Sequence, residues 1–218
     1  MKKQYKLGVI GTGFMAQAIL KGVIYSDSLK PKKIIVSDAS EQALEKVEYL
    51  GVQRTRSNAD VADSCEYLLL AVKPQNFAAV AESIRGIPVE KVITIMAGVT
   101  KKTIKDTLLG VDVKVARAMP NLPCSVGSGM IALDASDFSE NIDDCAFIDS
   151  LFSNCGTVLN LPEEKLNAVT GISGSGPAYV YLFIDGLIKA GMAHGLTEDE
   201  AKTLAVTTVY GGAEMVAH

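Results

Sequence analysis

The sequence has few of the residues from which metal and nucleic-acid sites are usually built. Its 218 residues include no tryptophan and only two histidines, and its four cysteines are widely spaced, without a Cys-x-x-Cys pair. We therefore predict no bound metal, and we expect reduced thiols in the core of a cytoplasmic protein. The 21 basic and 25 acidic side chains leave a net charge of −4, which offers a polyanion no basic surface and argues against nucleic acid as a partner.

Long apolar runs are also missing. The longer ones, such as residues 67–72 and 178–184, fall far short of the roughly 20 residues needed to cross a bilayer. Gly11 and Gly13 interrupt the only apolar segment near the N-terminus, and no small-residue cleavage site follows. We therefore predict neither a membrane segment nor a secretory signal. The residues that are present, 48% apolar and 21% charged, have the balance of a packed globular chain.

Residues 1–161 alternate short β-rich runs with helical patterns, which predicts an α/β fold with a mostly parallel sheet. We predict strands at residues 7–10, 34–36, 52–55, 67–72, 92–96 and 113–117. Apolar residues mark two helix faces, one through Met15, Ala18, Ile19, Gly22 and Val23 and the other through Leu44, Val47 and Leu50. After Pro120 the regular alternation of strand and helix patterns changes. Strands at 130–133 and 157–161, around a helix within 139–153, predict a sheet that widens with a differently connected edge.

Residues 162–218 carry no strand pattern, and we predict an all-α domain there. Ser175 before Pro177 is typical of a helix start. The run at 178–184 has no polar break, and a helix that is apolar all round must be covered on every side, so we predict that a second subunit covers it in a homodimer. Thr197 and Glu200 form a capping-box pattern ahead of an apolar stripe. The stripe continues to the last residues without a stop, as it would in a shortened chain.

The segment Gly11-Thr12-Gly13-Phe14-Met15-Ala16 follows the first predicted strand and opens the first helix, which is the context of a dinucleotide-binding turn. Gly11 would permit the tight turn, Gly13 would let the backbone approach a pyrophosphate, and Ala16 would keep helix and strand close. Glycine pairs also occur in ordinary strand-to-helix turns, but the position at the first strand favours nucleotide binding. We therefore predict a Rossmann-like dinucleotide-binding domain over residues 1–161.

Asp38 ends the second predicted strand, where an acidic residue commonly takes a ribose hydroxyl. Its carboxylate would repel an added 2′-phosphate by up to about 4 kcal/mol at close range in an intermediate dielectric, which favours NAD over NADP. The alternative is that Asp38 caps a helix beginning near Glu41.

Two further strand ends should line the same crevice, because ligands bind outside the carboxyl ends of parallel strands. Ala71-Val72-Lys73-Pro74-Gln75 ends the fourth predicted strand, and Ala97-Gly98-Val99 ends the fifth. The competing explanations are that Lys73 is a solvated turn residue and that Gly98 only forms a turn.

Together with two later segments, these stretches resemble the pyrroline-5-carboxylate reductase family. The later segments are Arg-Ala-Met-Pro-Asn at residues 117–121 and Ser-Gly-Ser-Gly-Pro-Ala-Tyr at residues 173–179. The order and spacing of all the stretches fit the family along the whole chain. The glycine turn occurs in many dehydrogenases, whereas the two later segments together are highly specific.

The resemblance implies NAD(P)H-dependent reduction of 1-pyrroline-5-carboxylate to L-proline, the last step of proline biosynthesis, in a homodimer made by a helical domain over residues 162–218. It implies that the cofactor is bound by Gly11, Thr12, Gly13, Phe14, Met15, Ala16, Ser37, Asp38, Asn58, Ala71, Val72, Lys73, Pro74, Ala97 and Gly98. Gly174, Ser175 and Gly176 would bring a helix N-terminus to the substrate carboxylate, although close helix packing explains the two glycines equally well. Hydride transfer to an imine needs no strong general base, so we predict no particular catalytic side chain.

Two features depart from the family. Members commonly prefer NADPH and often have an uncharged residue at the second-strand end, whereas Asp38 is acidic with no basic residue beside it. The resemblance thus favours NADPH and Asp38 favours NADH. Members also continue beyond residue 218 into more helix and a Ser-Pro-Gly-Gly-Thr-Thr-like loop that helps to bind the substrate. Without that loop we expect an incomplete catalytic site and a weakened dimer.

Two other functions fit parts of the sequence. A non-catalytic nucleotide-binding protein would keep the dinucleotide-binding half without turnover. A related hydroxyacid dehydrogenase would need a catalytic lysine on the helical domain, for which Lys189 is the candidate. Because Asp185 precedes Lys189 by one helical turn, an ion pair is the better explanation of that lysine.

Overall fold

The computed structural model describes residues 3–108 and 112–218, and their contacts form two compact units. The N-terminal unit spans Met1–Gly174, and the helical unit spans Ser175–His218. The sequence places a domain boundary after residue 161, where the strand pattern ends. In the structure, residues 163–174 make most of their contacts within the N-terminal unit. The domain boundary after residue 161 stays a prediction.

The N-terminal unit is built around an eight-stranded sheet with the order β3-β2-β1-β4-β5-β6-β7-β8. The strands are β1 (Tyr5–Ile10), β2 (Ile34–Ser37), β3 (Gln53–Thr55), β4 (Cys65–Leu70), β5 (Lys91–Thr94), β6 (Lys114–Met119), β7 (Gly129–Asp134) and β8 (Gly156–Asn160). The first six are parallel, β7 is antiparallel to β6, and β8 is parallel to β7. The predicted strands and the differently connected edge are confirmed. The carboxyl ends of β1 to β6 therefore meet at one edge of the sheet.

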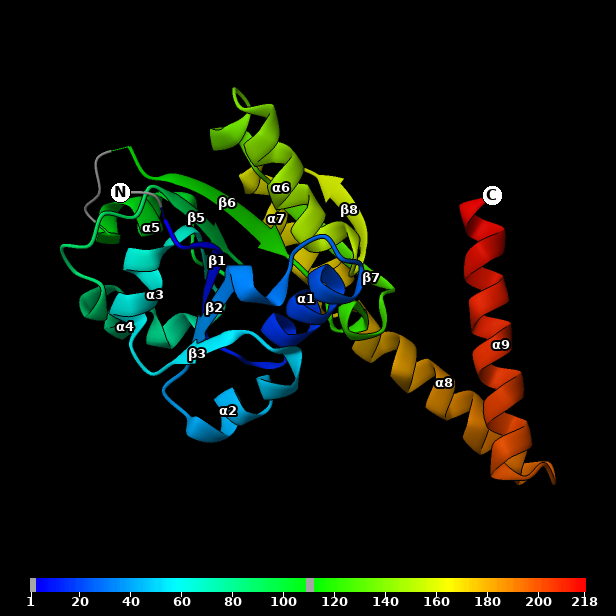
Figure 1. Cartoon of the computed structure of the whole chain (residues 1–218). Helices are drawn as coiled ribbons and strands as arrows, with labels where there is room; N and C mark the ends of the chain where they lie inside the picture. The colour runs from blue at the N-terminus through cyan, green and yellow to red at the C-terminus, as the bar shows by residue number, and fades with distance from the viewer. Residues whose placement is uncertain (1–2, 109–111) are drawn as a thin grey trace. The chain divides into compact units, whose positions relative to one another are not determined.

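Helices cover both faces of this sheet (Figure 1). Helices α1 (Phe14–Tyr25) and α6 (Ile142–Ser153) pack on one face, and α3 (Asn58–Ser64), α4 (Phe77–Ser83) and α5 (Lys101–Leu108) pack on the other. In β4, Tyr67 and Leu69 belong to the first core, whereas Leu68 and Leu70 belong to the second. A strand that is apolar on both faces has to be covered twice, which is why the unbroken apolar run marks the buried centre of the sheet.

One predicted helix is divided in the structure. Helix α2 (Glu41–Glu45) ends early and is followed by a 3₁₀ turn, Glu48–Leu50, which Gly51 closes in the left-handed conformation at φ 70°. The prediction of one helix face through Leu44, Val47 and Leu50 is wrong in this respect, although all three side chains are buried. Their three-residue spacing satisfies a 3₁₀ turn as well as an α-helix, so the apolar pattern alone does not separate the two.

A buried polar cluster ties α6 to the sheet. The Tyr67 hydroxyl donates to the Asp144 carboxylate, and Lys91 Nζ lies 2.7 Å from Asp144 Oδ1. Burial by itself would raise the pKa of Asp144, but the hydrogen bonds from Lys91 and Tyr67 outweigh it and hold that pKa below its ordinary value. The carboxylate therefore stays charged and paired within the core.

A second buried ion cluster ties α5 to the β7 side of the sheet. Lys101 Nζ lies 3.1 Å from Asp134 Oδ1 and 2.6 Å from Asp137 Oδ1. Burial alone would lower the pKa of Lys101, but the bonds to Asp137 and Asp134 outweigh it, so the pKa lies above its ordinary value. Burial would raise the pKa of both carboxyl groups, but hydrogen bonds from Ser136 and then Lys101 hold the pKa of Asp134 below the ordinary range, and those from Lys101 and Lys105 do the same for Asp137.

The helical unit consists of α8 (Gly176–Ala193) and α9 (Glu198–Ala217), which pack against each other. The predicted capping box is confirmed, since the Glu200 N–H donates to Thr197 Oγ1 at 3.3 Å and the Thr197 N–H donates to Glu200 Oε2 at 2.8 Å. Lys189 Nζ lies 2.7 Å from Asp185 Oδ2, which confirms the predicted ion pair. Among the described residues, none of the helices is both long and apolar enough to cross a bilayer.

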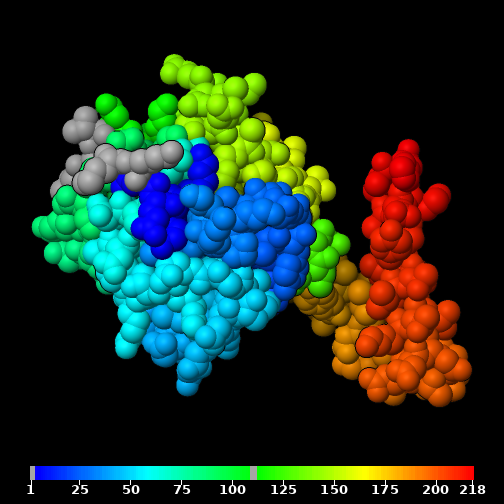
Figure 2. All heavy atoms as spheres, in the orientation of Figure 1, coloured from blue at the N-terminus to red at the C-terminus, as the bar shows by residue number. Residues whose placement is uncertain are grey.

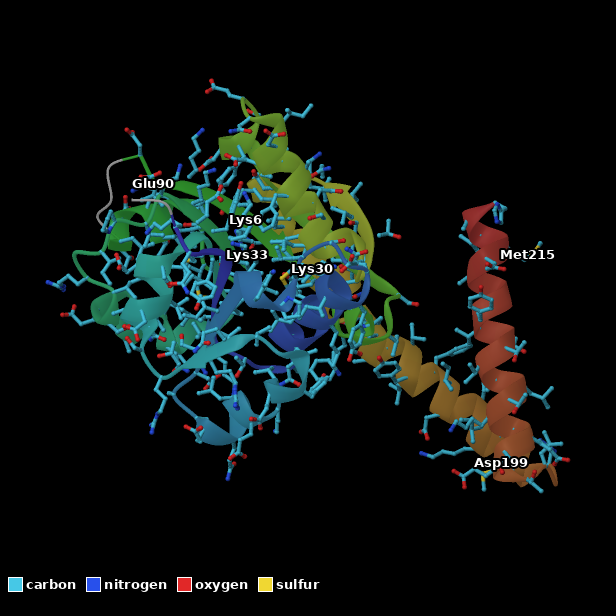
Figure 3. The ribbon with its side chains drawn as sticks, in the orientation of Figure 1. Lys6, Lys30, Lys33, Glu90, Asp199 and Met215 are labelled. Atoms are coloured by element: carbon cyan, nitrogen blue, oxygen red, sulfur yellow. The ribbon has the colours of Figure 1, made fainter. Side chains whose placement is uncertain are left out.

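The large apolar side chains of the helical unit are exposed. Tyr179, Leu182 and Phe183 of α8 are 62%, 74% and 60% exposed, and the buried side chains of α9 are Ala201 and Ala205. Figure 2 draws the end of α9 in red, and Figure 3 shows the exposed side chain of Met215 projecting from this helix. The predicted helix with apolar residues all round is therefore present, with its large side chains uncovered.

Candidate active site

A cleft of about 560 Å³ lies at the carboxyl ends of the central strands. The end of β1, the end of β4 and the start of α4 contribute to its walls, together with the chain that follows β2. The lining residues are Ile10, Gly11, Gly13, Asp38, Ala39, Asn58, Ala71, Val72, Lys73, Asn76, Ala79 and Val80. The cleft stands where an open parallel sheet takes its ligand, at the strands whose order reverses around β1 and β4.

Gly11 makes the turn out of β1. Its N–H donates to the Ser37 carbonyl at 2.8 Å, and its φ of +97° belongs to a region that side chains with a Cβ rarely adopt. A Cβ at this position would lie 2.8 Å from the Ala71 carbonyl oxygen and 2.9 Å from Val72 Cγ1. Both the conformation and the space therefore require glycine here.

Gly13 is the N-cap of α1, and its surroundings are open. No heavy atom lies within 4 Å of the place where a Cβ would stand, and no side chain caps the helix. The first hydrogen bond of the helix runs from the Gln17 N–H to the Gly13 carbonyl at 3.0 Å, which leaves the preceding N–H groups of the first turn without an intrahelical partner. An open glycine at the positive end of a 12-residue helix fits an anion such as a pyrophosphate.

Asp38 connects the glycine turn to the end of β2. Its Oδ2 accepts from the Thr12 N–H at 2.8 Å and from Thr12 Oγ1 at 3.1 Å, and its Oδ1 accepts from the Ser40 N–H at 2.9 Å. The alternative that Asp38 caps the following helix is wrong, because Ser40 is the N-cap and its side chain accepts from the Ala43 N–H. The carboxylate thus lines the cleft and also fixes the shape of the turn.

The structure brings a basic residue to Ala39, the residue that follows Asp38 in the chain. Arg56 directly follows β3, and its Nη2 lies 3.5 Å from the Ala39 carbonyl oxygen. Asn58 is held by two hydrogen bonds, from Ser37 Oγ to its Oδ1 at 2.7 Å and from its Nδ2 to Ser83 Oγ at 3.0 Å. Asp38 and Asn58 therefore give this end of the cleft one carboxylate and one fixed amide, while Arg56 contacts the backbone of Ala39, which also lines the cleft.

Several predicted cofactor residues support the cleft without lining it. Thr12, Ala16 and Ser37 are buried, and Met15 packs against the core. Phe14 is 56% exposed, Pro74 opens the 3₁₀ turn Pro74–Asn76, and Ala97 with Gly98 follows β5. The cleft in turn contains Ile10, Ala39, Asn76, Ala79 and Val80, which we did not predict. Ile10 and Ala39 are next to predicted residues in the sequence. Asn76, Ala79 and Val80 are brought to the cleft by the turn and helix that follow β4.

Of the predicted substrate residues, Gly174 ends the N-terminal unit, and Ser175 and Gly176 begin the helical unit. Gly174 ends a π-helical turn, Thr170–Gly174, in the N-terminal unit, and a Cβ on Gly174 would lie 3.1 Å from Met119 Cε. Ser175 is the N-cap of α8 as predicted, but its side chain makes no capping hydrogen bond. No heavy atom lies within 4 Å of the place where a Cβ on Gly176 would stand. The first turn of α8 therefore has no side-chain cap, Pro177 carries no N–H, and the Ala178 N–H donates to the Ser175 carbonyl at 3.0 Å.

The remaining reactive side chains take no part in this cleft. The four cysteines are free thiols, and burial raises the pKa of Cys65 and Cys155 to about 12, which keeps them protonated at neutral pH. His194 is the C-cap of α8. In residues 3–108 and 112–218 no group of three histidine, cysteine or acidic side chains could hold a metal ion.

Comparison with known proteins identifies the family of this chain. A model of the family described as pyrroline-5-carboxylate reductase dimerisation matches residues 163–218, and one described as NADP oxidoreductase, coenzyme F420-dependent, matches residues 6–98. The chain is 41% identical to the pyrroline-5-carboxylate reductase of Synechocystis sp. over 215 residues, which are 97% of this chain and 79% of the relative.

Solved structures give the same result. The pyrroline-5-carboxylate reductase of Coxiella burnetii has a TM-score of 0.87 and 32% identity, over 99% of this chain and 80% of that one. The Plasmodium falciparum pyrroline carboxylate reductase, solved with NADP bound, has a TM-score of 0.86 and 30% identity, over 100% of this chain and 80% of that one. Both the sequence and the fold therefore place this chain in the pyrroline-5-carboxylate reductase family.

Proposed function

We propose that this protein reduces 1-pyrroline-5-carboxylate to L-proline with NAD(P)H, the last step of proline biosynthesis. The observation that carries the proposal is membership of the family together with a cleft that the glycine turn forms at the carboxyl ends of β1 and β4. When bound, the reduced nicotinamide supplies the hydride for the imine carbon, and the imine nitrogen is protonated. The protein's part is to bind and orient the two molecules.

The residues of the cleft account for cofactor binding in three places. The unpaired N–H groups after Gly13 would take the pyrophosphate, while Asp38 and Asn58 would face the adenosine half. The chain after β4, Ala71 to Lys73, and Gly98 after β5 would border the nicotinamide half. These roles follow from the position of each residue at the carboxyl edge of the sheet.

For the substrate we propose the first turn of α8. Gly174, Ser175 and Gly176 lead into that turn, and its N–H groups would meet the substrate carboxylate. No histidine lines the cleft, which suits a reaction in which the protein orients the imine and needs no strong general base.

On the choice of cofactor we propose that Asp38 favours NADH. Three N–H or O–H donors hold its carboxylate at the cleft, where it would repel a 2′-phosphate, and Arg56 beside Ala39 reduces that repulsion without cancelling it. Asp38→Asn should shift the ratio of kcat/KM values toward NADPH by about tenfold or more, and Arg56→Gln should shift it toward NADH. Arg54→Gln is the matched control, since Arg54 pairs with Glu48 instead.

We further propose that the protein is a homodimer joined through the helical unit. The exposed Tyr179, Leu182 and Phe183 of α8 support this, as does the match of residues 163–218 to the dimerisation family.

The test is a measurement of NADH and NADPH oxidation with 1-pyrroline-5-carboxylate, together with a binding titration of each cofactor. We expect turnover with both, and we expect Gly13→Ala to weaken cofactor binding because a methyl group would occupy the open place at the helix end. Gly211→Ala is the control, since it too has no atom within 4 Å of its Cβ position but lies on α9. Binding without turnover would favour a non-catalytic nucleotide-binding protein, and absence of both would overturn the proposal.

A further inference from the structure

The Arg-Ala-Met-Pro-Asn segment at the end of β6 has a role that the cofactor site does not explain. Arg117, Met119 and Asn121 are two residues apart, and alternate residues of an extended chain share a face. Asn121 continues the extended backbone beyond β6, with φ −121° and ψ 169°. All three side chains contact the same stretch of chain, residues 163–174.

Asn121 makes the most complete of these contacts. Its Nδ2 donates to the Ser173 carbonyl at 3.0 Å, and its Oδ1 accepts from the Met130 N–H at 2.9 Å. The side chain is 8% exposed, so both ends of the amide are fixed in a largely dry environment. A donor at one end and an acceptor at the other are needed here, and among side chains of this size only an amide provides both.

Glu163 fixes the start of the same stretch. Its Oε1 lies 3.1 Å from Arg117 Nη1 and accepts from the Lys101 N–H at 2.7 Å. The Arg117 side chain is nearly buried, so the pair is shielded from solvent. Lys101 begins α5, directly after the loop that contains Gly98, and Glu163 therefore joins that loop and β6 to the beginning of residues 163–174.

The far end of the stretch stands at the edge of the sheet where the cleft opens. β6 is parallel to β5 and, through it, to β4 and β1, so its carboxyl end lies on the same side as theirs. Gly174 packs against Met119 at that end and closes the π-helical turn Thr170–Gly174. Single π turns of this kind are frequent at functional sites.

We infer that Asn121 is a positioning residue for substrate binding. Through the Ser173 carbonyl it holds the π-helical turn at the end of β6, and thereby fixes where the chain enters Gly174, Ser175 and Gly176. Arg117 and Glu163 hold the other end of the stretch. The effect on catalysis rests on the proposed function, whereas the effect on the turn does not.

The test uses Asn121→Asp in the full chain. This change keeps the size and the acceptor for Met130, removes the donor to Ser173, and sets an oxygen against the Ser173 carbonyl. We expect the KM for 1-pyrroline-5-carboxylate to rise about ten- to a hundredfold, since a shift of about 1 Å can cost that much. The Kd of NADH and NADPH should stay within about twofold, as expected for a change outside the cofactor cleft.

Asn154→Asp is the matched control. Its Nδ2 also donates to a backbone carbonyl, that of Ser150 at 2.9 Å, but it lies at the end of α6. We expect no change in KM from this variant. Hydrogen exchange of the amides of residues 171–176 gives a readout that needs no turnover, and it should be faster in Asn121→Asp than in Asn154→Asp.

The outcomes separate this inference from the proposed function. If the unaltered chain has no activity, the proposed function fails, and hydrogen exchange decides whether Asn121 holds the π-helical turn. Equal KM values and equal exchange in the two variants would overturn the inference. Should Asn121→Asp fail to fold, Asn121→Ser, which removes the amide donor to the Ser173 carbonyl without adding a charge, decides it by the same two measurements.

Discussion

The two units of this chain contain similar apolar residues but use them differently. In the N-terminal unit the side chains of α1, α6 and the central strands are buried in two cores, one on each face of the sheet. In the helical unit the largest side chains of α8 are exposed, and α9 buries only Ala201 and Ala205. A sheet covered twice supplies its own core, whereas two helices cannot cover each other all round. In the homodimer proposed above, a second subunit covers these side chains, and the stability of the helical unit would then depend on that subunit.

The largest expected effect tests that dependence directly. Phe183→Glu should dissociate the homodimer, because a buried charge without a partner is costly and a twofold axis repeats it in both subunits. At about 2 kcal/mol for each copy, the dimer Kd should rise about a thousandfold. Sedimentation equilibrium measures it, with Ile142→Glu on the exposed surface of α6 as control. A Phe183→Glu protein that remains a dimer would show that α8 is not the interface.

The next effect should fall on the N-terminal unit and leave assembly unchanged. Lys101→Met leaves Asp134 without its lysine inside the core, and we expect the free energy of unfolding to fall by about 3 kcal/mol. Urea unfolding measures this loss. Lys102→Met is the control, since the neighbouring Lys102 is 81% exposed and its pair with Asp106 lies in solvent, where such pairs contribute about 0.5 kcal/mol. If Lys101→Met lowered the free energy of unfolding no more than Lys102→Met does, the buried pair would add nothing to stability beyond an exposed pair.

Acid should weaken the N-terminal unit through its buried carboxylates. The pKa values of Asp134, Asp137 and Asp144 are held below their ordinary range by the lysines and hydroxyls that face them. The unfolded chain therefore binds these protons first. Their contribution is present above about pH 4 and is lost as the pH falls through the folded pKa values. Urea midpoints between pH 7 and 3 should decline, and less steeply for Asp144→Asn than for the exposed Asp106→Asn.

A smaller effect separates folding from binding within the glycine turn. Gly11→Ala should lower stability by about 2 kcal/mol, because alanine is strained at φ +97° and its methyl group meets Ala71 and Val72. Gly13→Ala should leave the thermal midpoint unchanged, because its Cβ position is open. Thermal unfolding without cofactor compares them, and similar midpoints for the two variants would contradict this account of Gly11.

The smallest effect concerns Lys189. This side chain is 74% exposed and pairs with Asp185 one turn earlier, so Lys189→Ala should change stability by no more than about 0.5 kcal/mol and leave kcat unchanged. A large loss of kcat would instead show that Lys189 takes part in the reaction. Steady-state kinetics with 1-pyrroline-5-carboxylate measures it, and Lys202→Ala on α9 serves as the control.

Much of the fold was predictable because its information is local. β4 was readable from an unbroken apolar run, and the β1 turn from Gly11 and Gly13, since each depends on the properties of the residues themselves. The capping box of Thr197 and Glu200 was predictable for the same reason. The single helix through Leu44 and Leu50 was not, because its spacing allows two kinds of helix.

The sequence by itself determined the order of strands and helices along the chain and the glycine turn, and it predicts that α8 needs a partner. Only the tertiary structure decided that Asp38 bonds to Thr12, that Arg56 reaches Ala39, and that Asn121 holds Ser173. These pairs lie 26, 17 and 52 residues apart along the chain. Their geometry arises when parallel strands bring distant chain ends to one edge of the sheet, and no periodicity within a single segment encodes it.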